Sequence, residues 1–339
     1  MAIKNKTIVI TLILVLATTI TVAIYSLVQI SGLAARPVSR QLRYPIEGVK
    51  IDPNLILYQT SGWFQIDLAR PKDICIDPNG LVYVVGDKAI CVYESTGKMA
   101  ARIDLSFEPY AVAVGPDGLW YLTAADHVEV YDRSGTALMT WPRPDPEALL
   151  TSIAVCGRDV FVADSANRIV YRYDQLGQLL GRIGQKDPAK GVDGLVVPSP
   201  NLDVACGQDG LLIVTNPGRH RVEFYRSDGQ LVRWWGRFGY DIEGFTGCCN
   251  PVSIAALSDG GIVTAEKGLV RIKLFWQEGH LLGVVAGPLE LGLTSGQVCQ
   301  SPEDCQSGVF KLATDLHGRI YVLDPLARQV RVFARRAVL

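Results

Sequence analysis

The chain has few of the residues and motifs on which most enzyme active sites depend. It has four histidines in 339 residues, and none stands at a spacing typical of a metal site. It contains no glycine-rich phosphate loop, no nucleophile elbow and no dinucleotide-binding fingerprint. A Cys-x-x-Cys-His motif is also missing, which excludes a c-type haem. We therefore expect no cofactor and no metal ion, and we favour a non-enzymatic role over catalysis.

An excess of charge of one sign is also lacking. The 33 Lys and Arg side chains nearly balance the 34 Asp and Glu side chains, so the formal net charge is −1 at pH 7. Such a chain has no overall electrostatic attraction to nucleic acid. We expect no nucleic-acid partner, and recognition by charge has to come from a local patch.

One long segment near the N-terminus has no charged side chain at all. Two lysines among the first six residues precede this run, which extends from Thr7 to Ile30. Roughly 20 apolar residues cross the hydrocarbon core of a bilayer, so we predict a signal anchor, that is, a transmembrane helix, over residues 1–30. The run is longer than the core of a cleaved signal peptide, although cleavage near Ala35 is the alternative. We then expect the rest of the chain in the periplasm or the extracellular space.

What is present is a phrase that recurs six times. Each copy has a short apolar run, a turn rich in Pro, Asp, Asn and Gly, a second run, and a third run that ends near an acidic residue and Gly. Runs this short and this rich in Val, Ile, Tyr and Phe are typical of β-strands. The copies begin at Asp73, Ala111, Ser152, Asp203, Ser253 and Lys311. This repeat predicts an all-β fold, a six-bladed β-propeller with four strands in each blade.

The sixth copy ends soon after its third strand, so one blade lacks a strand. Propellers avoid an open sheet edge by completing one blade with strands from both ends of the chain. We therefore assign residues 31–55 to a linker and residues 56–339 to the propeller, with residues 56–70 supplying the missing outer strand.

Several motifs in these copies resemble the NHL-repeat family of propellers. The turns DPNG and GPDG, the strands VYVV and YVLD, and a basic residue that follows, as in LDPLARQVRVF, carry the resemblance over about residues 70–335. The chain looks most like uncharacterised bacterial NHL-repeat proteins that share NPGRHR, here at 216–221, and EGFxGCCNP, here at 243–251. The resemblance implies a six-bladed propeller. It implies no particular activity, because the family includes binding modules, sensor domains and occasionally enzymes.

One face of the predicted ring carries the candidate binding residues. In a four-stranded blade, the turn between the second and third strands and the connection to the next blade emerge on the same side. The long connections 184–201, 236–250 and 287–308 therefore share a face with those turns, and long loops in a compact fold are often functional. Cations of the fourth and fifth copies gather there: Arg219, His220, Arg237, Lys267, Arg271 and Lys273.

These cations predict a site for an anionic ligand or for an acidic segment of a protein partner. Arg binds carboxylate and phosphate through paired hydrogen bonds, which makes it well suited to this role. The alternative is that Asp241, Glu243 and Glu266 neutralise the cations within the protein. Aromatic residues of the same region suit either a contact surface or packing between blades: Trp234, Trp235, Phe238, Tyr240 and Phe245.

The eight cysteines fall into two groups of four. We expect the first group to be small buried side chains in or beside apolar strands: Cys75, Cys91, Cys156 and Cys206. We predict disulfide bonds among the second group, which lies in two long connections of the proposed face: Cys248, Cys249, Cys299 and Cys305. Three pairings are open, and one of them joins the neighbours Cys248 and Cys249. A zinc site is the less favoured alternative, because the spacing differs from that of the usual ligand pairs.

The sequence thus favours a membrane-tethered propeller that binds a protein partner or an anionic ligand. Two alternatives stay open. A metal-dependent hydrolase or lactonase-like enzyme would use carboxylates near the inner strands, such as Asp73, Asp203 and Asp315. An accessory subunit of a membrane redox or transport complex would use the same face for assembly.

Overall fold

The computed structural model describes residues 16, 18–21, 51–293 and 309–336. The chain divides into two units, Met1–Arg43 and Tyr44–Leu339. In the first unit, residues 16 and 18–21 are helical. No helix within the described residues is long and apolar enough to cross a membrane. The predicted span from Thr7 to Ile30 lies almost entirely outside those residues, as does most of the predicted linker.

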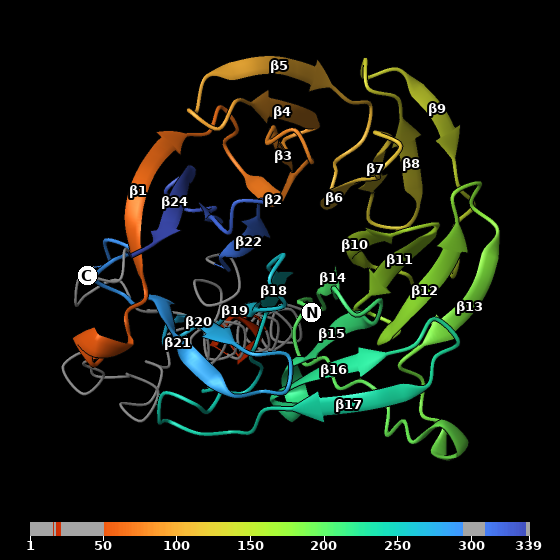
Figure 1. The fold of residues 1–339 in the computed structure, drawn as a ribbon. Coiled ribbons are helices and arrows are strands. Elements are labelled where there is room, and N and C mark those ends of the chain that lie inside the picture. Colours follow the sequence, from red (N-terminus) through yellow and green to blue (C-terminus); the bar gives the residue numbers. More distant parts are fainter. Residues whose placement is uncertain (1–15, 17, 22–50, 294–308, 337–339) are drawn as a thin grey trace, which may run out of the picture. The chain divides into compact units, whose positions relative to one another are not determined.

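The second unit is a ring of six antiparallel sheets of four strands each, as Figure 1 shows. In five of these blades the strands follow the chain from the axis outward. The first blade contains β2 (Pro71–Ile76), β3 (Val82–Gly86), β4 (Ala89–Tyr93) and β5 (Met99–Asp104), and the second contains β6 (Ala111–Val114), β7 (Trp120–Thr123), β8 (Val128–Tyr131) and β9 (Ala137–Thr140). The third contains β10 (Leu150–Cys156), β11 (Asp159–Asp164), β12 (Ile169–Asp174) and β13 (Leu179–Ile183). The fourth contains β14 (Val204–Cys206), β15 (Leu212–Asn216), β16 (Arg221–Tyr225) and β17 (Leu231–Trp235), and the fifth contains β18 (Ser253–Ala256), β19 (Ile262–Ala265), β20 (Ile272–Phe275) and β21 (Leu281–Ala286).

The sixth blade is built from both ends of the propeller sequence. Its three inner strands are β22 (Lys311–Thr314), β23 (Ile320–Asp324) and β24 (Gln329–Arg335), and its outer strand is β1 (Tyr58–Gln65). The register places Tyr58 opposite Arg335 and Gln65 opposite Gln329. β1 therefore covers the edge of β24, as expected from the shortened sixth repeat, and the six-bladed fold is confirmed.

The Asp-x-x-Gly turns between the first two strands of a blade have a simple chemical basis. In the first blade the Asp77 carboxylate accepts hydrogen bonds from the backbone N–H groups of Asn79 and Leu81, at 2.9 and 2.8 Å. Gly80 follows with a φ of 84°, which suits glycine because it has no Cβ to clash. Hydrogen bonds between residues close in sequence thus stabilise this tight turn without any contact between blades.

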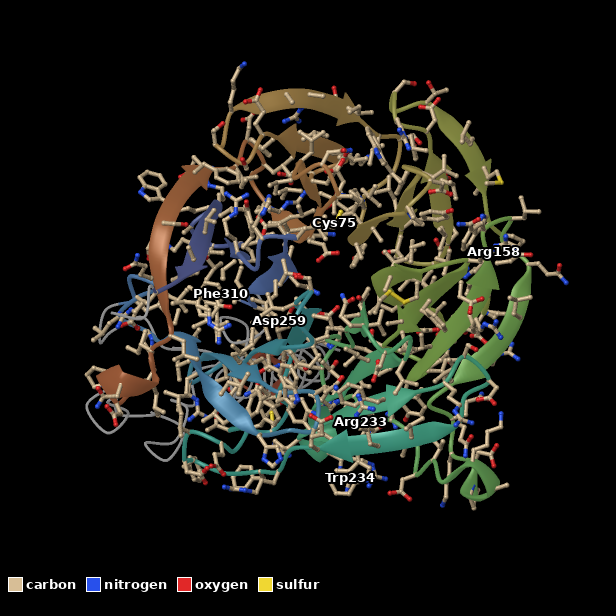
Figure 2. All side chains as sticks on the ribbon, viewed as in Figure 1. Cys75, Arg158, Arg233, Trp234, Asp259 and Phe310 are labelled. Carbon is tan, nitrogen blue, oxygen red and sulfur yellow. A yellow bond between two sulfur atoms is a disulfide. The ribbon has the colours of Figure 1, made fainter. Side chains whose placement is uncertain are left out.

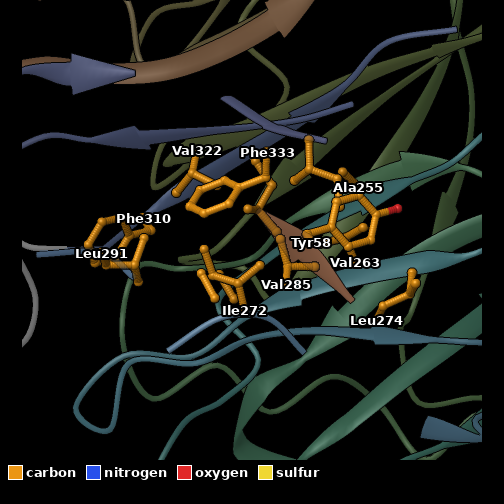
Figure 3. Close-up of a cluster of buried hydrophobic side chains, with 14 of the residues drawn as sticks. Tyr58, Ala255, Val263, Ile272, Leu274, Val285, Leu291, Phe310, Val322 and Phe333 are labelled. Atoms are coloured by element: carbon orange, nitrogen blue, oxygen red, sulfur yellow. The ribbon is translucent and has the colours of Figure 1, made fainter. Parts of the chain in front are cut away.

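The hydrophobic core lies between neighbouring blades rather than in one centre. Figure 3 shows the cluster between the fifth and sixth blades, where Ile272 and Val285 face Val322 and Phe333. Tyr58 of β1 joins this cluster and is 2% exposed. Because both faces of each blade are covered in this way, second strands such as β3, β7 and β19 are buried along their whole length, which explains their continuous hydrophobic runs.

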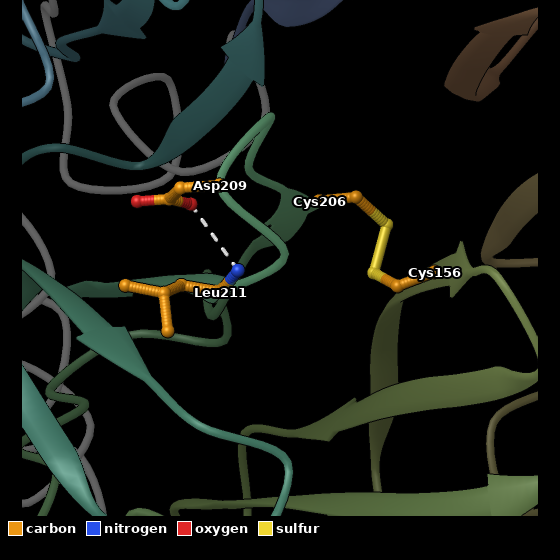
Figure 4. The surroundings of a disulfide bond; sticks show 4 residues. All are labelled: Cys156, Cys206, Asp209 and Leu211. Carbon is orange, nitrogen blue, oxygen red and sulfur yellow. Dashed lines mark hydrogen bonds between the residues drawn. A yellow bond between two sulfur atoms is a disulfide. The ribbon is translucent and has the colours of Figure 1, made fainter.

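A disulfide bond joins the third and fourth blades, and it was not among the predicted pairs. It links Cys156, at the end of β10, to Cys206, at the end of β14, with their Cα atoms 5.5 Å apart (Figure 4). The expectation of two isolated buried thiols at these positions is therefore wrong. The repeat explains why, since equivalent ends of adjacent inner strands meet around the axis at a distance that a disulfide spans.

Candidate functional site

The face that carries the long connections is built mainly by two of them within the described residues. One connection runs from Gly184 to β14, and the other runs from Gly236 to β18. The turns between β15 and β16 and between β19 and β20 lie beside them, because backbone and side-chain hydrogen bonds tie Val196 to Gly218 and Thr246 to Glu266. Most of the third long connection, after β21, lies outside the described residues, including Cys299 and Cys305.

Arg271 and Lys273 form a buried ion cluster with Glu266. The Arg271 guanidinium donates to both Glu266 oxygens at 2.9 and 3.0 Å, and the Lys273 ammonium lies 2.9 Å from Glu266 Oε1. All three side chains are at most 1% exposed. Burial lowers the pKa of Lys273 to about 8, although the Glu266 carboxylate partly opposes this shift.

The same two cations anchor the connection that follows β17. Arg271 donates to the backbone oxygens of Asp241 and Gly244, both at 2.9 Å, and Lys273 donates to those of Ile242 and Gly244 at 3.1 and 2.8 Å. Their donors are thus used within the protein. This arrangement is the internal neutralisation by Glu266 that the sequence left open as the alternative to anion binding.

The other predicted cations lie closer to solvent but also have partners. Arg237 is paired with Asp241, at 2.9 Å, and lies 3.8 Å from Glu243. Arg219 lies 3.7 Å from Asp193, and it donates to the backbone oxygen of Gly194 at 3.2 Å. Exposed pairs of this kind contribute little to stability, because solvent screens them.

Asn216 occupies the position where the third blade has Asp164. Its side chain accepts a hydrogen bond from the backbone N–H of Val196 at 2.9 Å, as Asp164 does from that of Leu149 at 3.0 Å. Asn216 also donates to Glu223 at 2.8 Å, whereas Asp164 accepts from the Tyr171 hydroxyl. The fourth blade therefore has no acidic residue in this turn, but it has a buried one, Glu223, on the following strand β16.

A group of aromatic and basic side chains, of which three are exposed and two half-buried, lies on the fourth blade and the connection after it. We call it the blade-four aromatic surface: His220, Arg221, Trp234, Phe238 and Tyr240. Arg221 lies over the Trp234 ring at 3.6 Å, and the Phe238 ring contacts those of His220 and Tyr240, each with ring centres 5.3 Å apart. Figure 2 shows Trp234 on β17, at the outer edge of this blade.

The other two aromatic residues of this region are buried between the fourth and fifth blades. Trp235 is 7% exposed and packs on Phe275 with ring centres 4.8 Å apart, and Phe245 is fully buried. Successive side chains of β17 point to opposite faces of the blade, so Trp235 packs between blades while Trp234 lies at the surface. The sequence could not assign these roles, since Trp234 and Trp235 are neighbours with the same chemistry.

A polar cavity of about 240 Å³ lies on the axis and is lined by all six inner strands. Asp73, Ser152 and Asp203, each the first residue of its repeat, line this cavity, and Lys311 has the equivalent position in the sixth repeat. The Asp73 carboxylate accepts from the backbone N–H of Val112, and Asp203 accepts from Ser152 Oγ at 2.5 Å and from the Ile254 N–H at 3.0 Å. These bonds join adjacent blades around the axis.

Around this cavity, two carboxylates and one ammonium interact. Burial raises the pKa of Asp73 to about 7, and Asp203 adds to the shift while Lys311 opposes it. Burial would lower the pKa of Lys311, but the Asp203 and Asp73 carboxylates outweigh it and raise that pKa. Asp315, the third carboxylate considered from the sequence, instead caps a turn and pairs with Arg319.

Within the described ranges, no group of three or more His, Cys, Asp and Glu side chains is arranged to hold a metal ion. The cysteines of this face lie in the connection after β17. Cys248 and Cys249 are free thiols here, with their sulfur atoms 3.1 Å apart. Lys267, predicted as a ligand-binding cation, donates to Ser199 at 2.9 Å beside Cys249.

Comparison with solved structures supports the fold. The chain is similar to virginiamycin B lyase from Staphylococcus aureus, with a TM-score of 0.56 and 12% identity over 81% of this chain and 99% of that one. A streptogramin B lyase matches with a TM-score of 0.57 and 12% identity over 81% and 97%. A catalytically inactive virginiamycin B lyase from S. aureus with quinupristin matches with a TM-score of 0.54 and 12% identity over 80% and 82%. No protein-family model and no curated protein matches the sequence.

Proposed function

We propose that this chain is a binding propeller that engages a protein partner through the blade-four aromatic surface. The charge-free segment from Thr7 to Ile30 supports tethering to a membrane, with the propeller outside the cytoplasm. The motifs NPGRHR and GCCNP support membership of the NHL-repeat family, and both contribute to the face that carries this surface.

The exposure of large aromatic side chains carries the proposal. Trp234, Phe238 and Tyr240 are 47%, 51% and 64% exposed. Aromatic residues and Arg dominate the energy of protein interfaces, because they bury much area at low cost in conformational entropy. Contacts of Arg221 with Trp234 and of His220 with Phe238 hold these rings in place before binding, which lowers that cost further.

The charge near this surface indicates the chemistry of the partner. Arg219 and Arg221 share one exposed carboxylate, Asp193, at 3.7 and 3.9 Å, and the buried carboxyl of Glu223 also interacts with both guanidinium groups. A segment that carries an apolar side chain for the rings and a carboxylate for the guanidinium groups fits this arrangement. We therefore replace the anionic ligand expected from the sequence with an acidic segment of a protein partner. In this proposal Arg219 and Arg221 bind the segment, rather than Arg271 and Lys273.

The test is capture of the partner by the full-length protein from detergent-solubilised membranes, with a tag at the C-terminus. Phe238→Ala combined with Tyr240→Ala should reduce capture by at least about tenfold, because each lost anchor of this kind costs about 2 kcal/mol. The control is Leu176→Ala, which removes a side chain that is 78% exposed on the third blade. Equal capture by the double variant, at an unchanged melting temperature, would refute the proposal.

Catalysis at the axial cavity is the second candidate function. Two observations favour it: a carboxyl with a pKa near neutrality, as a general acid or base requires, and the likeness of the fold to two named lyases. Incubation of the protein with quinupristin and divalent cations, followed by mass spectrometry, tests this candidate. Cleavage that is lost in Asp73→Asn would favour the enzyme, and an intact substrate would favour the binding role.

A further inference from the structure

Two neighbouring thiols stand on the same face, outside the aromatic surface. Cys248 is exposed and Cys249 is 2% exposed, and their sulfur atoms lie 3.1 Å apart without a bond. The loop that carries them is fixed on both sides. His220 contacts the backbone oxygen of Gly247 at 2.8 Å, and Asn250 both donates to the backbone oxygen of Lys267 and accepts from its N–H.

Ser199 and Lys267 form a polar site around the inner sulfur. The Ser199 hydroxyl donates to Cys249 Sγ at 3.5 Å and accepts from Lys267 Nζ at 2.9 Å. Asn201 donates a further hydrogen bond to Ser199, which fixes the direction of its hydroxyl proton. Ser199 and Lys267, from two separate segments of the chain, thus converge on one sulfur atom that is nearly closed to solvent.

This environment favours a thiolate at Cys249. Burial alone would raise its pKa, but the hydrogen bonds from Ser199 and Cys248 and the charge of Lys267 outweigh burial and lower it. Burial raises the pKa of Cys248, and the hydrogen bond to Cys249 adds to that shift. The two shifts are opposite in direction, so Cys249 loses its proton more readily than the exposed Cys248.

Adjacency along the chain keeps these sulfurs within reach of each other, and it makes a bond between them easy to reduce. Adjacent Cα atoms are about 3.8 Å apart, which is shorter than the separation of about 4.4–6.8 Å that unstrained disulfides prefer. A bond under such strain is more readily reduced than a structural disulfide. The Cys156–Cys206 pair, with Cα atoms 5.5 Å apart, lies within the unstrained range.

We propose that Cys248 and Cys249 are a thiol–disulfide exchange site that accepts an organic disulfide as its oxidant. Cys249 takes the proton of Cys248 as the Cys248 sulfur attacks the disulfide, which forms a mixed disulfide and releases one thiolate. Cys249 returns the proton to that leaving thiolate and then attacks Cys248 Sγ, which displaces the second thiolate. The sum converts one thiol, one thiolate and one disulfide into the Cys248–Cys249 bond, one free thiol and one free thiolate.

The test uses the full-length protein in detergent, with the Cys156–Cys206 bond intact and Cys248 and Cys249 as free thiols, exposed to oxidised glutathione and then digested for mass spectrometry. We expect a glutathione adduct on Cys248 at early times and a peptide with a Cys248–Cys249 bond later, both reversed by dithiothreitol while the Cys156–Cys206 bond persists. Cys248→Ser should prevent adduct formation, and Cys249→Ser should trap the adduct. Cys91, a buried thiol with a raised pKa, should stay unmodified.

The role of Ser199 and Lys267 around Cys249 is tested separately, by the rate at which the glutathione adduct forms at neutral pH. Lys267→Met should slow it about tenfold, as expected when a thiol pKa rises by about one unit. Lys186→Met, which changes an exposed lysine elsewhere on the chain, should leave the rate unchanged. Lack of reaction at Cys248, a permanent bond to Cys299 or Cys305, or equal rates in both variants would overturn the proposal.

Discussion

At Asn216 and Glu266, two neighbouring blades satisfy the same turn with a neutral amide in one and a carboxylate in the other. Each blade must satisfy the turn between its second and third strands while covering a buried position on the third strand. The fourth blade uses an amide that donates to Glu223, and the fifth uses a carboxylate that accepts from Lys273. A buried charge without such a partner would cost several kcal/mol, so each substitution in the repeat requires a second one at a fixed distance.

The carboxyl of Asp73 should make the stability of the propeller depend on pH. The pKa of this group is about 7 in the folded protein, against 3.8 for an ordinary Asp. Between these values the folded state holds a proton that the unfolded state has released, so the free energy of unfolding through this group falls as pH rises from about 4 to about 7. Asp73→Asn cannot lose a proton, and it should remove this contribution.

Urea unfolding at about pH 4.5, 6 and 7.5 measures the effect. The difference in unfolding free energy between the native protein and Asp73→Asn should shift in favour of the variant as pH rises. The control is Asp104→Asn, which changes a carboxylate that is 82% exposed. Its unfolding free energy should change with pH in parallel with that of the native protein. Parallel curves for Asp73→Asn would show that its carboxyl titrates normally.

Among the elements, β1 closes the ring, because it supplies the outer strand of the sixth blade. Its residues alternate in exposure, with Phe64 at 7% and Trp63 at 62%. Phe64 packs on Tyr93 of the first blade with ring centres 5.4 Å apart, so this strand also links the last blade to the first. The exposed side chain of Trp63, on the outer face of the same strand, contributes no such link between blades.

Phe64→Ala should therefore lower the free energy of unfolding by about 3–5 kcal/mol, because it leaves a cavity between two blades. Trp63→Ala removes a larger side chain from the same strand and should change it by less than about 0.5 kcal/mol. Chemical denaturation of the two variants compares them directly. Similar losses in both would mean that β1 acts through its backbone pairing alone.

For the whole molecule, the Cys156–Cys206 bond should act as a staple between two blades. It closes a segment with a sequence separation of 50 residues, and a bond of this kind typically contributes about 2–4 kcal/mol by restricting the unfolded chain. Replacing both cysteines by Ser should lower the melting temperature, and reductant should have little further effect on that variant. Cys75→Ser, a change at an unbonded cysteine of an inner strand, should not reproduce the loss.

The repeat by itself determined the number of blades and the strand that closes the ring. Short-range chemistry is sufficient for this, because each turn is built by residues within four positions of one another, as at Asp77 and Leu81. The face that carries the long connections follows from the same alternation of strand direction. A periodic sequence therefore predicts a periodic fold without knowledge of any distant contact.

Only the tertiary structure decided what the irregular residues do. Arg271 and Lys273 are buried because backbone oxygens of residues 241–244, about 30 positions earlier, accept their hydrogen bonds. Cys156 meets Cys206, and Lys267 meets Ser199 beside Cys249, across blades that the sequence places far apart. The exposure of Trp234 and the burial of Trp235 depend in the same way on the packing of blade on blade. Contacts between distant segments have no local signal, so ring closure assigns these roles.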